Sequence, residues 1–356
     1  MKIAVDAMGG DNAPGEIVKG AVQAAQEYNQ EIVLVGDQEM LQKELEGYTS
    51  KLVTIHHAPE VISMSESPVV AVRRKKGSSI VQVIKLLKEG TASAAVSAGN
   101  TGAIMAAGVL MLRLIEGIDR PALAAVVPSK GGCTMILDVG ANVDCKPVHI
   151  LQFAIMGHLY AQEVMRIKNP RVGLLNIGEE VTKGNELTLA AFPMLQKAEL
   201  NFIGNVEGRD ICQGTVDVVV CDGFIGNVVL KALEGIGAVF MQMMKEEANK
   251  DWIGRAGFTM SMSALRNFQR RLDYAEYGGA PLLGLNGLII VCHGSSTSRA
   301  VKNAIRFARE SVQKNLTSAI QNSIHRIQYK GRNINAQWST SRYPGSWHLY
   351  TRAQIN

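Results

Sequence analysis

The feature that most limits how this chain can fold is a repeated unit, in which a short apolar run, a polar glycine-bearing turn and a helical pattern follow one another. The stretch Asp222–Asn227 is typical, since the apolar run Val216–Cys221 precedes it and the longest helical pattern, Val228–Lys250, follows it. Apolar runs that alternate with helical patterns favour right-handed βαβ units. The sequence therefore predicts a three-layer αβα fold around a mostly parallel, partly mixed sheet, in which Ala122–Pro128 and Cys133–Val139 form an antiparallel hairpin.

Composition and charge narrow the class of protein. Hydrophobic residues make up 47% of the 356-residue chain and charged residues 19%, which is enough for a large core. The formal net charge is +5, and the segment 326–356 holds five basic residues and no acidic one. The rest of the chain is therefore neutral, which argues against a nucleic-acid-binding core. We expect a single domain over residues 1–325, and we leave the basic tail 326–356 out of the fold.

Cysteine and hydropathy patterns exclude other classes. The five cysteines are scattered without a C-x-x-C pair, so neither a disulfide framework nor a zinc site is expected, and no metal or cofactor is predicted. The most apolar runs, such as Ala103–Leu112, are too short to span a bilayer, and the chain opens directly on a predicted strand, Lys2–Asp6, without a signal peptide. We therefore expect a cytoplasmic protein.

Similar polar turns follow six predicted strands. In an open parallel sheet, ligands bind outside the carboxyl ends of the strands. Glycines, amides and hydroxyls at helix N-termini suit a phosphate-bearing ligand, and Lys183 supplies a cation. Taken alone, each turn is equally compatible with a structural role, because most strand-to-helix turns bind nothing. The turns are Asp6–Asn12, Ser97–Gly102, Asp138–Asn142, Asn176–Glu186, Asp222–Asn227 and His293–Ser296.

Several well-known site patterns are absent. Gly99-Asn-Thr-Gly102 is followed by neither the Gly-Lys-Ser/Thr of a Walker motif nor a G-x-G-x-x-G spacing, which weakens a dinucleotide-binding interpretation. No serine or cysteine lies in a nucleophile elbow, so covalent catalysis is not indicated. His293 is compatible with a general base, although a lone histidine before Gly-Ser is more often a turn residue.

Two surface features have both a structural and a functional interpretation. The basic run Arg73–Lys76 is either a solvated face or a contact for an acidic partner. A hairpin of two helices, about 228–275, is predicted to carry an apolar tip that includes Trp252, Ile253, Phe258 and Met260. That tip either packs on a second subunit or enters a membrane surface.

The turns together, in this order, resemble those of the bacterial phosphate acyltransferase family PlsX. The matching motifs are Asp6-Ala-Met-Gly-Gly-Asp-Asn-Ala-Pro14, Ser97-Ala-Gly-Asn-Thr-Gly102, Asp138-Val-Gly-Ala-Asn142, Asn176-Ile-Gly-Glu-Glu180 with Lys183-Gly-Asn-Glu186, and Asp222-Gly-Phe-Ile-Gly-Asn227. The resemblance covers about residues 1–322. One departure is Asn12, where many members carry histidine, so the role of that histidine is in doubt here.

The resemblance implies an enzyme that transfers a fatty acyl group from acyl carrier protein to inorganic phosphate. The acyl phosphate would feed a membrane glycerol-3-phosphate acyltransferase that makes lysophosphatidic acid. The implied fold is similar to that of phosphotransacetylases and of isocitrate and isopropylmalate dehydrogenases. The implied assembly is a homodimer, peripherally associated with the inner face of the cell membrane.

The chemistry of this reaction assigns roles to particular residues. Phosphate is already nucleophilic at neutral pH, so the protein needs only to position it and to stabilise the tetrahedral oxyanion. Lys183 is expected to neutralise phosphate charge and Asn227 to donate its amide to the oxyanion, and the resemblance points to the same two residues. Arg73, Arg74, Arg266, Arg270 and Arg271 are expected to contact the acidic carrier protein. The residues expected to bind phosphate or substrate are Asp6, Gly9, Gly10, Asn12, Ser97, Gly99, Asn100, Thr101, Asp138, Asn142, Glu180, Asn185, Asp222, Gly226, His293 and Ser295.

Three other functions remain open at this stage. A phosphotransacetylase acting on a coenzyme A thioester needs the same phosphate-binding turns. A dehydrogenase of the isopropylmalate type needs a metal-binding carboxylate cluster and a nucleotide-specific loop, and neither is evident in the sequence. A membrane-docking scaffold without activity does not require so many polar glycine turns.

Overall fold

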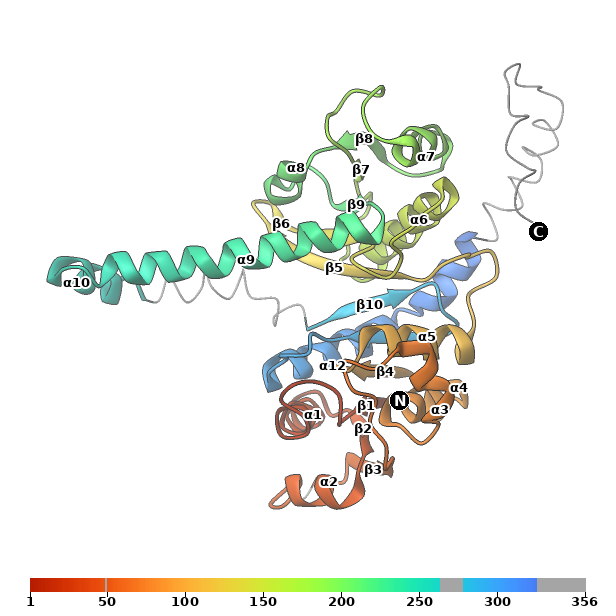
Figure 1. Ribbon diagram of the computed structural model, residues 1–356, viewed down its shortest axis with the longest axis vertical. Helices are drawn as coiled ribbons and strands as arrows, with labels where there is room; N and C mark the ends of the chain where they lie inside the picture. The colour runs from red at the N-terminus through yellow and green to blue at the C-terminus, as the bar shows by residue number, and fades with distance from the viewer. Residues whose placement is uncertain (49, 263–277, 325–356) are drawn as a thin grey trace, which may run out of the picture.

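The computed structural model describes residues 1–48, 50–262 and 278–324, and this part of the chain is built around one eleven-stranded sheet (Figure 1). The strand order is β3-β2-β1-β4-β11-β10-β5-β6-β9-β7-β8. The strands are β1 (Lys2–Asp6), β2 (Glu31–Gly36), β3 (Val53–His57), β4 (Ala94–Ser97), β5 (Ala122–Ser129), β6 (Gly132–Leu137), β7 (Val172–Leu175), β8 (Phe202–Val206), β9 (Val218–Val220), β10 (Ala280–Leu283) and β11 (Leu288–Val291).

The helices follow the strands with the alternation that the sequence predicts. They are α1 (Gly15–Tyr28), α2 (Gln38–Glu44), α3 (Pro68–Arg74), α4 (Ser79–Lys88), α5 (Thr101–Leu112), α6 (Pro147–Glu163), α7 (Glu186–Lys197), α8 (Gly208–Gln213), α9 (Gly223–Ala248), α10 (Trp252–Met260) and α12 (Ser298–Gln313).

The sheet consists of two parallel halves that run in opposite directions. Strands β1 to β4 and β11 are parallel to one another, and so are β6, β9, β7 and β8. Between them, β10 is antiparallel to both β11 and β5, and β5 is antiparallel to β6. The carboxyl ends of the two halves therefore lie at opposite edges of the sheet, whereas a fully parallel sheet would place all of the polar turns at one edge.

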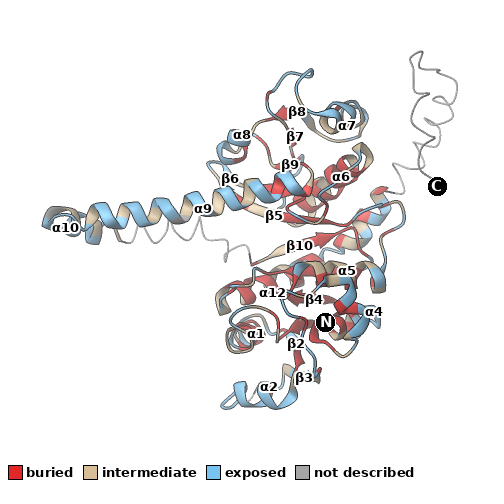
Figure 2. Ribbon diagram, in the orientation of Figure 1, coloured by how far each residue is buried: buried red, intermediate tan, exposed pale blue. Residues whose placement is uncertain are grey.

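Helices cover both faces of the sheet, which confirms the predicted αβα class. One core cluster joins the sheet to α1, α6, α7 and α12, and the other joins it to α3, α4, α5 and α8. Strands β4, β7, β9 and β11 are buried along their whole length, because parallel strands lie under helices on both sides. Figure 2 shows this pattern, with buried strands between helices whose outer surfaces are exposed.

Helix α9 begins five residues earlier than the sequence pattern predicts, so Asp222–Asn227 is its N-cap and first turns, not a separate loop. The Asp222 side chain caps the helix by accepting a hydrogen bond from the Ile225 N–H at 2.9 Å. A Cβ on Gly223 would lie 2.7 Å from the carbonyl oxygen of Asn142, and one on Gly226 would overlap the carbonyl oxygen of Asp138. These glycines therefore let the helix approach the β6 loop closely.

Other short elements also differ from expectation. The apolar tip predicted as a turn is helix α10, capped by Asp251, whose side chain accepts from the Gly254 N–H. Strand β10 and the short helices α3 and α8 were not predicted from the sequence. The secondary structure of such short segments is determined by contacts with the rest of the fold, so their local sequence patterns are weak. The second helix of the predicted hairpin falls in 263–277, outside the described residues.

Helix α9 also changes the membrane argument, which considered only shorter runs. It has 26 residues and a window of mean hydropathy 1.6, so by length and composition it could cross a bilayer. Its beginning is nevertheless packed against the sheet through Val229, Leu230 and Leu233, and Lys231 and Glu234 interrupt it. In Figure 1, α9 crosses over β5 and β6 and then projects from the body with α10 at its end.

The close contact of Gly226 with the β6 loop gives a testable prediction. Gly226→Ala puts a methyl group against the carbonyl oxygen of Asp138, so we expect it to lower the free energy of unfolding by about 1–3 kcal/mol in urea titrations. Gly237→Ala is the matched control, because a Cβ there meets nothing within 4 Å and helix propensity then favours alanine by roughly 0.5–1 kcal/mol. Equal stabilities for the two variants would contradict this packing.

Candidate active site

A cleft of about 320 Å³ lies on the face of the central strands, between α5 and α9. Its floor comes from β5 and the ends of β10 and β11, and its walls from the two helices. It is lined by Thr101, Leu123, Ala125, Val126, Val139, Gly140, Asn227, Leu230, Lys231, Glu234, Gly278, Gly279, Ala280, Val291, Cys292, His293 and Ser296. Residues from both halves of the sheet therefore meet here, because α9 starts at β9 in one half and reaches the β11 turn in the other.

One face of α9 supplies the polar groups of the cleft. Asn227, Leu230, Lys231 and Glu234 line it, and their spacing of three and four residues places them on the same side of a helix. Asn227 packs against Gly140, where a Cβ would lie 3.6 Å from the Asn227 amide carbon. From Asn227 to Glu234 the helix rises about 10 Å. This face therefore runs from the β6 loop at one end to His293 at the other.

A buried carboxylate fixes the loop beneath Asn227. Asp138 accepts hydrogen bonds from the backbone N–H groups of Leu123, Ala141 and Asn142 at 3.1, 2.9 and 2.8 Å, and from the Asn142 amide at 2.8 Å. Burial raises the pKa of Asp138, and these hydrogen bonds oppose that rise. Asn142 in turn accepts the Gly223 N–H at 2.7 Å. Asp138 and Asn142, both predicted to bind substrate, therefore lie behind the cleft and hold the start of α9.

The turns after β1, β4 and β11 interlock at the other end. Ser97 Oγ donates to the fully buried Asp6 carboxylate at 2.6 Å, and burial raises the pKa of Asp6. The Asp11 N–H donates to the Gly294 carbonyl at 2.7 Å, and Asn12 Nδ2 donates to the Ser295 carbonyl at 3.3 Å. Three predicted glycines provide the close approach here, since an added Cβ would lie within 3.0 Å of neighbouring atoms at each of Gly9, Gly10 and Gly99.

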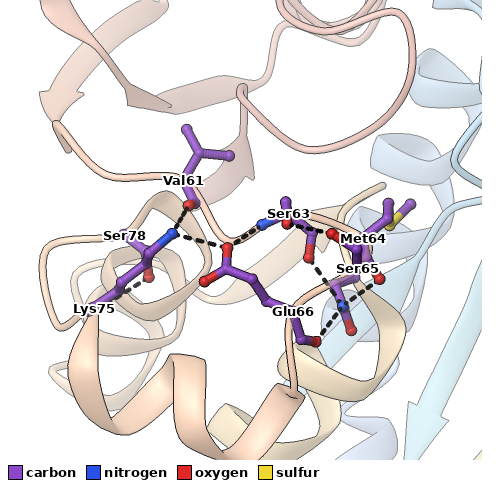
Figure 3. Close-up of polar contacts among 8 residues, drawn as sticks. Val61, Ser63, Met64, Ser65, Glu66, Lys75 and Ser78 are labelled. Atoms are coloured by element: carbon purple, nitrogen blue, oxygen red, sulfur yellow. Dashed lines mark hydrogen bonds and ion pairs between the residues drawn. The ribbon is translucent and has the colours of Figure 1, made fainter.

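Asn100 also proves to be a supporting residue. Its Oδ1 caps α5 by accepting the Ala103 N–H, while its Nδ2 donates to the carbonyls of Ser63, Met64 and Glu66 at 3.1, 3.2 and 3.4 Å. Figure 3 shows the same loop, in which the Glu66 carboxylate accepts hydrogen bonds from the Ser63 N–H at 2.7 Å and from Lys75 Nζ at 2.8 Å. The neighbouring residue, Thr101, faces the cleft.

The third group of predicted residues follows β7, and none of them lines the cleft. Asn176 Nδ2 donates to the Lys183 carbonyl at 3.0 Å, and Asn205 Nδ2 donates to the Glu180 carbonyl at 2.9 Å. Asn185 is the N-cap of α7. The Lys183 side chain is exposed, and Lys183 is not among the residues that line the cleft with Asn227. Strands β7 and β9 are parallel neighbours, so the turns that carry Lys183 and Asn227 follow the same end of the sheet.

The turn after β11 supplies His293, and two residues that the sequence analysis did not select lie beside it. His293 Nε2 is 3.5 Å from Lys231 Nζ, which pairs with the Glu234 carboxylate at 2.7 Å. Ser296 is buried and lines the same cleft. Lys231 follows Asn227 by four residues in a predicted helix, so helical spacing was the signal that could have identified it. Ser295, which was selected, contacts the ring nitrogen His293 Nδ1 through its Oγ at 2.7 Å.

The cysteines near the cleft are poor nucleophiles. Burial raises the pKa of Cys292, which lines the cleft, to about 12, and it raises the pKa of the buried Cys221 well above its ordinary value. Both thiols are therefore protonated at neutral pH, and only the thiolate attacks a carbonyl. Among the described residues, no group of three histidine, cysteine or carboxylate side chains is arranged to hold a metal ion.

The predicted partner surfaces are only partly described. Arg73 and Arg74 are exposed at the end of α3, whereas Lys75 pairs with Glu66. Arg266, Arg270 and Arg271 fall outside the described residues. At the hairpin tip, the exposed fractions of Trp252 and Met260 are 77% and 86%. Phe258 is half-buried, and the side chain of Ile253 is outside the described part.

A second cavity, of about 440 Å³, contains none of the predicted site residues. It lies between α6 and the last described residues, and it is lined by Ile155, His158, Leu159, Gln162, Glu163, Glu199, Leu200, Ala319, Asn322 and Ser323. Although it is larger, it combines no helix N-terminus with a cationic side chain. We therefore take the cleft between α5 and α9 as the candidate active site.

The fold is similar to that of solved phosphotransacetylases. A phosphotransacetylase from Streptococcus pyogenes superposes with a TM-score of 0.55 at 16% sequence identity, covering 88% of this chain and 94% of that protein. This likeness establishes the architecture alone.

Sequence comparison then establishes the family. The family model described as "Fatty acid synthesis protein" matches residues 1–319. A phosphate acyltransferase from Pelotomaculum thermopropionicum is 60% identical over 336 residues, which cover 94% of this chain and 98% of the relative. One from Heliobacterium modesticaldum is 56% identical over 327 residues, covering 91% and 98%. The chain belongs to this family of phosphate acyltransferases, which confirms the resemblance seen in the sequence, and it is an acyltransferase.

Proposed function

We propose that the protein transfers a fatty acyl group from acyl-[acyl carrier protein] to inorganic phosphate and so forms the acyl phosphate used to make lysophosphatidic acid. The observation that carries this proposal is the cleft between α5 and α9. It joins the polar side chains of Lys231, His293 and Ser296 to an apolar floor of Leu123 and Val126. An acyl thioester and a phosphate ion need these two environments side by side.

The chemistry requires no covalent intermediate. A phosphate oxygen attacks the thioester carbonyl carbon, the new C–O bond forms, and the C–S bond then breaks. The phosphate proton goes to the departing thiolate, so the products are acyl phosphate and the free carrier thiol. The protein's part is to hold both reactants in line and to stabilise the oxyanion of the tetrahedral intermediate. This agrees with the raised pKa of the Cys292 thiol, which leaves it protonated.

Asn227 is the residue that we assign to the oxyanion. It lies on the cleft face of α9, one turn beyond the capped N-terminus, where the helix dipole favours negative charge. Its amide donates without needing a proton transfer, which suits an oxyanion that exists only transiently. Lys183, whose side chain is exposed on the turn after β7, keeps its proposed role in neutralising the charge of phosphate.

The main alternative is a phosphotransacetylase that uses a coenzyme A thioester, because the fold is shared with proteins of that name. The cleft suits either thioester. The two possible acyl donors differ in the protein surface that they need: acyl carrier protein needs a docking face, and coenzyme A does not.

We predict that the purified protein forms acyl phosphate, trapped as hydroxamate, in a phosphate-dependent reaction that is faster with acyl carrier protein thioesters than with coenzyme A thioesters. Asn227→Ala should lower turnover by about 10²-fold, the usual effect of removing one oxyanion donor, and Lys183→Ala should also lower it with the fold intact by circular dichroism. A faster reaction with coenzyme A would favour the alternative. Wild-type rates in both variants would reject the assigned residues.

The docking face that we propose for the carrier protein includes Arg73 and Arg74, exposed at the end of α3. This face is close to the site, because α3 packs against α5 and Pro68 lies against Gly102. Acyl carrier protein is strongly acidic, so complementary charge would speed its encounter with this surface. Arg266, Arg270 and Arg271 belong to the same proposal but lie outside the described residues.

Charge reversal tests this face. In Arg73→Glu with Arg74→Glu, we expect a higher KM for the acyl carrier protein thioester and a weaker dependence on salt, because steering is screened over a Debye length of about 10 Å at 0.1 M salt. Lys43→Glu is the control, since Lys43 is an equally exposed lysine on α2. A KM equal to the wild-type value in the double variant would count against the proposed face.

For assembly and location, we propose that the apolar shaft of α9 pairs with a second copy and that the α10 tip contacts the membrane. The exposed stripe of Ile236, Val239, Phe240 and Met243 follows helical spacing along α9. Such a stripe is expected at a protein interface. The tip instead isolates single large side chains, Trp252 above all, beside basic residues, an arrangement that suits an anionic lipid surface. A peripheral cytoplasmic enzyme would there deliver acyl phosphate to a membrane glycerol-3-phosphate acyltransferase.

Sedimentation with vesicles of anionic phospholipid tests the tip. Trp252→Ser with Phe258→Ser should reduce the bound fraction several-fold, because fully burying one such large side chain contributes roughly 1.5–3 kcal/mol. Tyr48→Ser provides the control, since Tyr48 is an aromatic residue 43% exposed elsewhere on the surface. Unchanged sedimentation of the double variant would reject membrane contact through α10.

A further inference from the structure

The polar end of the cleft contains a buried hydroxyl group that the described residues leave unsatisfied. Ser296 is 1% exposed, and its Oγ has no hydrogen-bond partner in the described structure, yet the residue lines the cleft. An unpaired buried polar group costs free energy, and folded proteins keep few of them. Its position at the wall of a cleft points to a ligand that completes its hydrogen bonding.

A cationic side chain lies beside it. Lys231 Nζ is 3.5 Å from His293 Nε2 and 2.7 Å from the Glu234 carboxylate. An ammonium group has three N–H donors, so with one directed to each of these neighbours a third remains for an oxyanion in the cleft.

The N-terminus of a neighbouring helix adds positive electrostatic potential to this end of the cleft. Thr101 is the first residue of α5, a helix of 12 residues, and it lines the cleft. The first N–H groups of a helix have no acceptor within it, and its dipole favours an anion there. Helix α12 contributes less, because its first N–H, that of Ser298, donates to the Glu16 carboxylate at 2.6 Å. The positive end of α5 therefore faces the same space as Lys231 and Ser296.

We infer that Lys231, His293 and Ser296, together with the N-terminus of α5 at Thr101, form the binding subsite for a phosphate group, and that this group is the acceptor phosphate. The inference rests on the proposed acyl transfer to phosphate and locates its acceptor. Glu234 holds the Lys231 side chain against this end of the cleft through its 2.7 Å ion pair. Phosphate at this end meets a thioester carbonyl that lies toward Asn227, while the apolar floor at Val126 receives the first carbons of the acyl chain.

Direct binding of inorganic phosphate, measured by calorimetric titration of the full-length protein, tests the subsite apart from turnover. Lys231→Gln removes a charged donor and Ser296→Ala removes a neutral one, so each should raise the Kd for phosphate by about ten-fold or more. The KM for phosphate should rise in parallel, with the KM for the acyl donor unchanged. Lys245→Gln, an exposed lysine farther along α9, is the control and should bind phosphate like the wild type.

Thermal unfolding provides a readout that a merely structural role would not give. Without phosphate, Ser296→Ala should raise the Tm, because it removes an unsatisfied buried hydroxyl. With phosphate, the wild type should gain more in Tm than the variant, since only the wild type keeps the full set of donors. A lower Tm without phosphate would mean that Ser296 has an internal structural role, and it would overturn the inference.

The remaining outcomes separate the subsite from the proposed function. A Kd for phosphate equal to that of the wild type in both variants overturns the subsite, even if acyl phosphate is formed. A raised KM for the acyl donor with unchanged phosphate binding also overturns it, and assigns these residues to the phosphodiester of the donor's prosthetic group. Weakened phosphate binding in both variants of a protein that forms no acyl phosphate supports the subsite and rejects the reaction.

Discussion

The arrangement of the site depends on the contact between the first turn of α9 and the loop after β6. Gly223 and Gly226 have no side chains, which lets the helix backbone lie against Asn142 and Asp138. The Asp138 carboxylate is buried and accepts four N–H hydrogen bonds, which hold that loop in place. This contact therefore fixes the positions of the residues that follow on α9. The helix thereby carries Asn227 and Lys231 across the central strands to the turn after β11.

Because of this contact, α9 brings residues from the two halves of the sheet into one cleft. The two parallel halves run in opposite directions, so the turns after β1 and β4 and those after β6 and β9 lie at opposite edges. In a sheet of one direction the carboxyl edge alone gathers the site. Here α5 and α9 start from different halves and flank the same cleft over β5 and β10. The membership in the phosphate acyltransferase family is consistent with a site of this mixed, partly polar and partly apolar character.

Much of the fold could be predicted from the sequence, because strands such as Lys2–Asp6 and Glu31–Gly36 are apolar runs with clear turns at both ends, and helix Gly15–Tyr28 has a regular pattern. The direction of the second half could not, since it depends on β10, a four-residue strand without a local signal. Each of the predicted polar stretches follows a strand, and their residues divide into those that line the cleft, such as Thr101, and those that support it, such as Asn100. Sequence does not distinguish these roles, because capping and ligand binding favour the same residue types.

The central claim is that phosphate attacks the thioester directly in the cleft between α5 and α9, without an acyl-enzyme. Initial rates measured while the acyl carrier protein thioester and phosphate are both varied test it most directly, together with the intact mass of the protein after incubation with the donor alone. The account predicts intersecting double-reciprocal lines and no increase in mass, because both substrates must be bound before reaction. Parallel lines with an acyl adduct on the protein, the signature of a ping-pong mechanism, would contradict it.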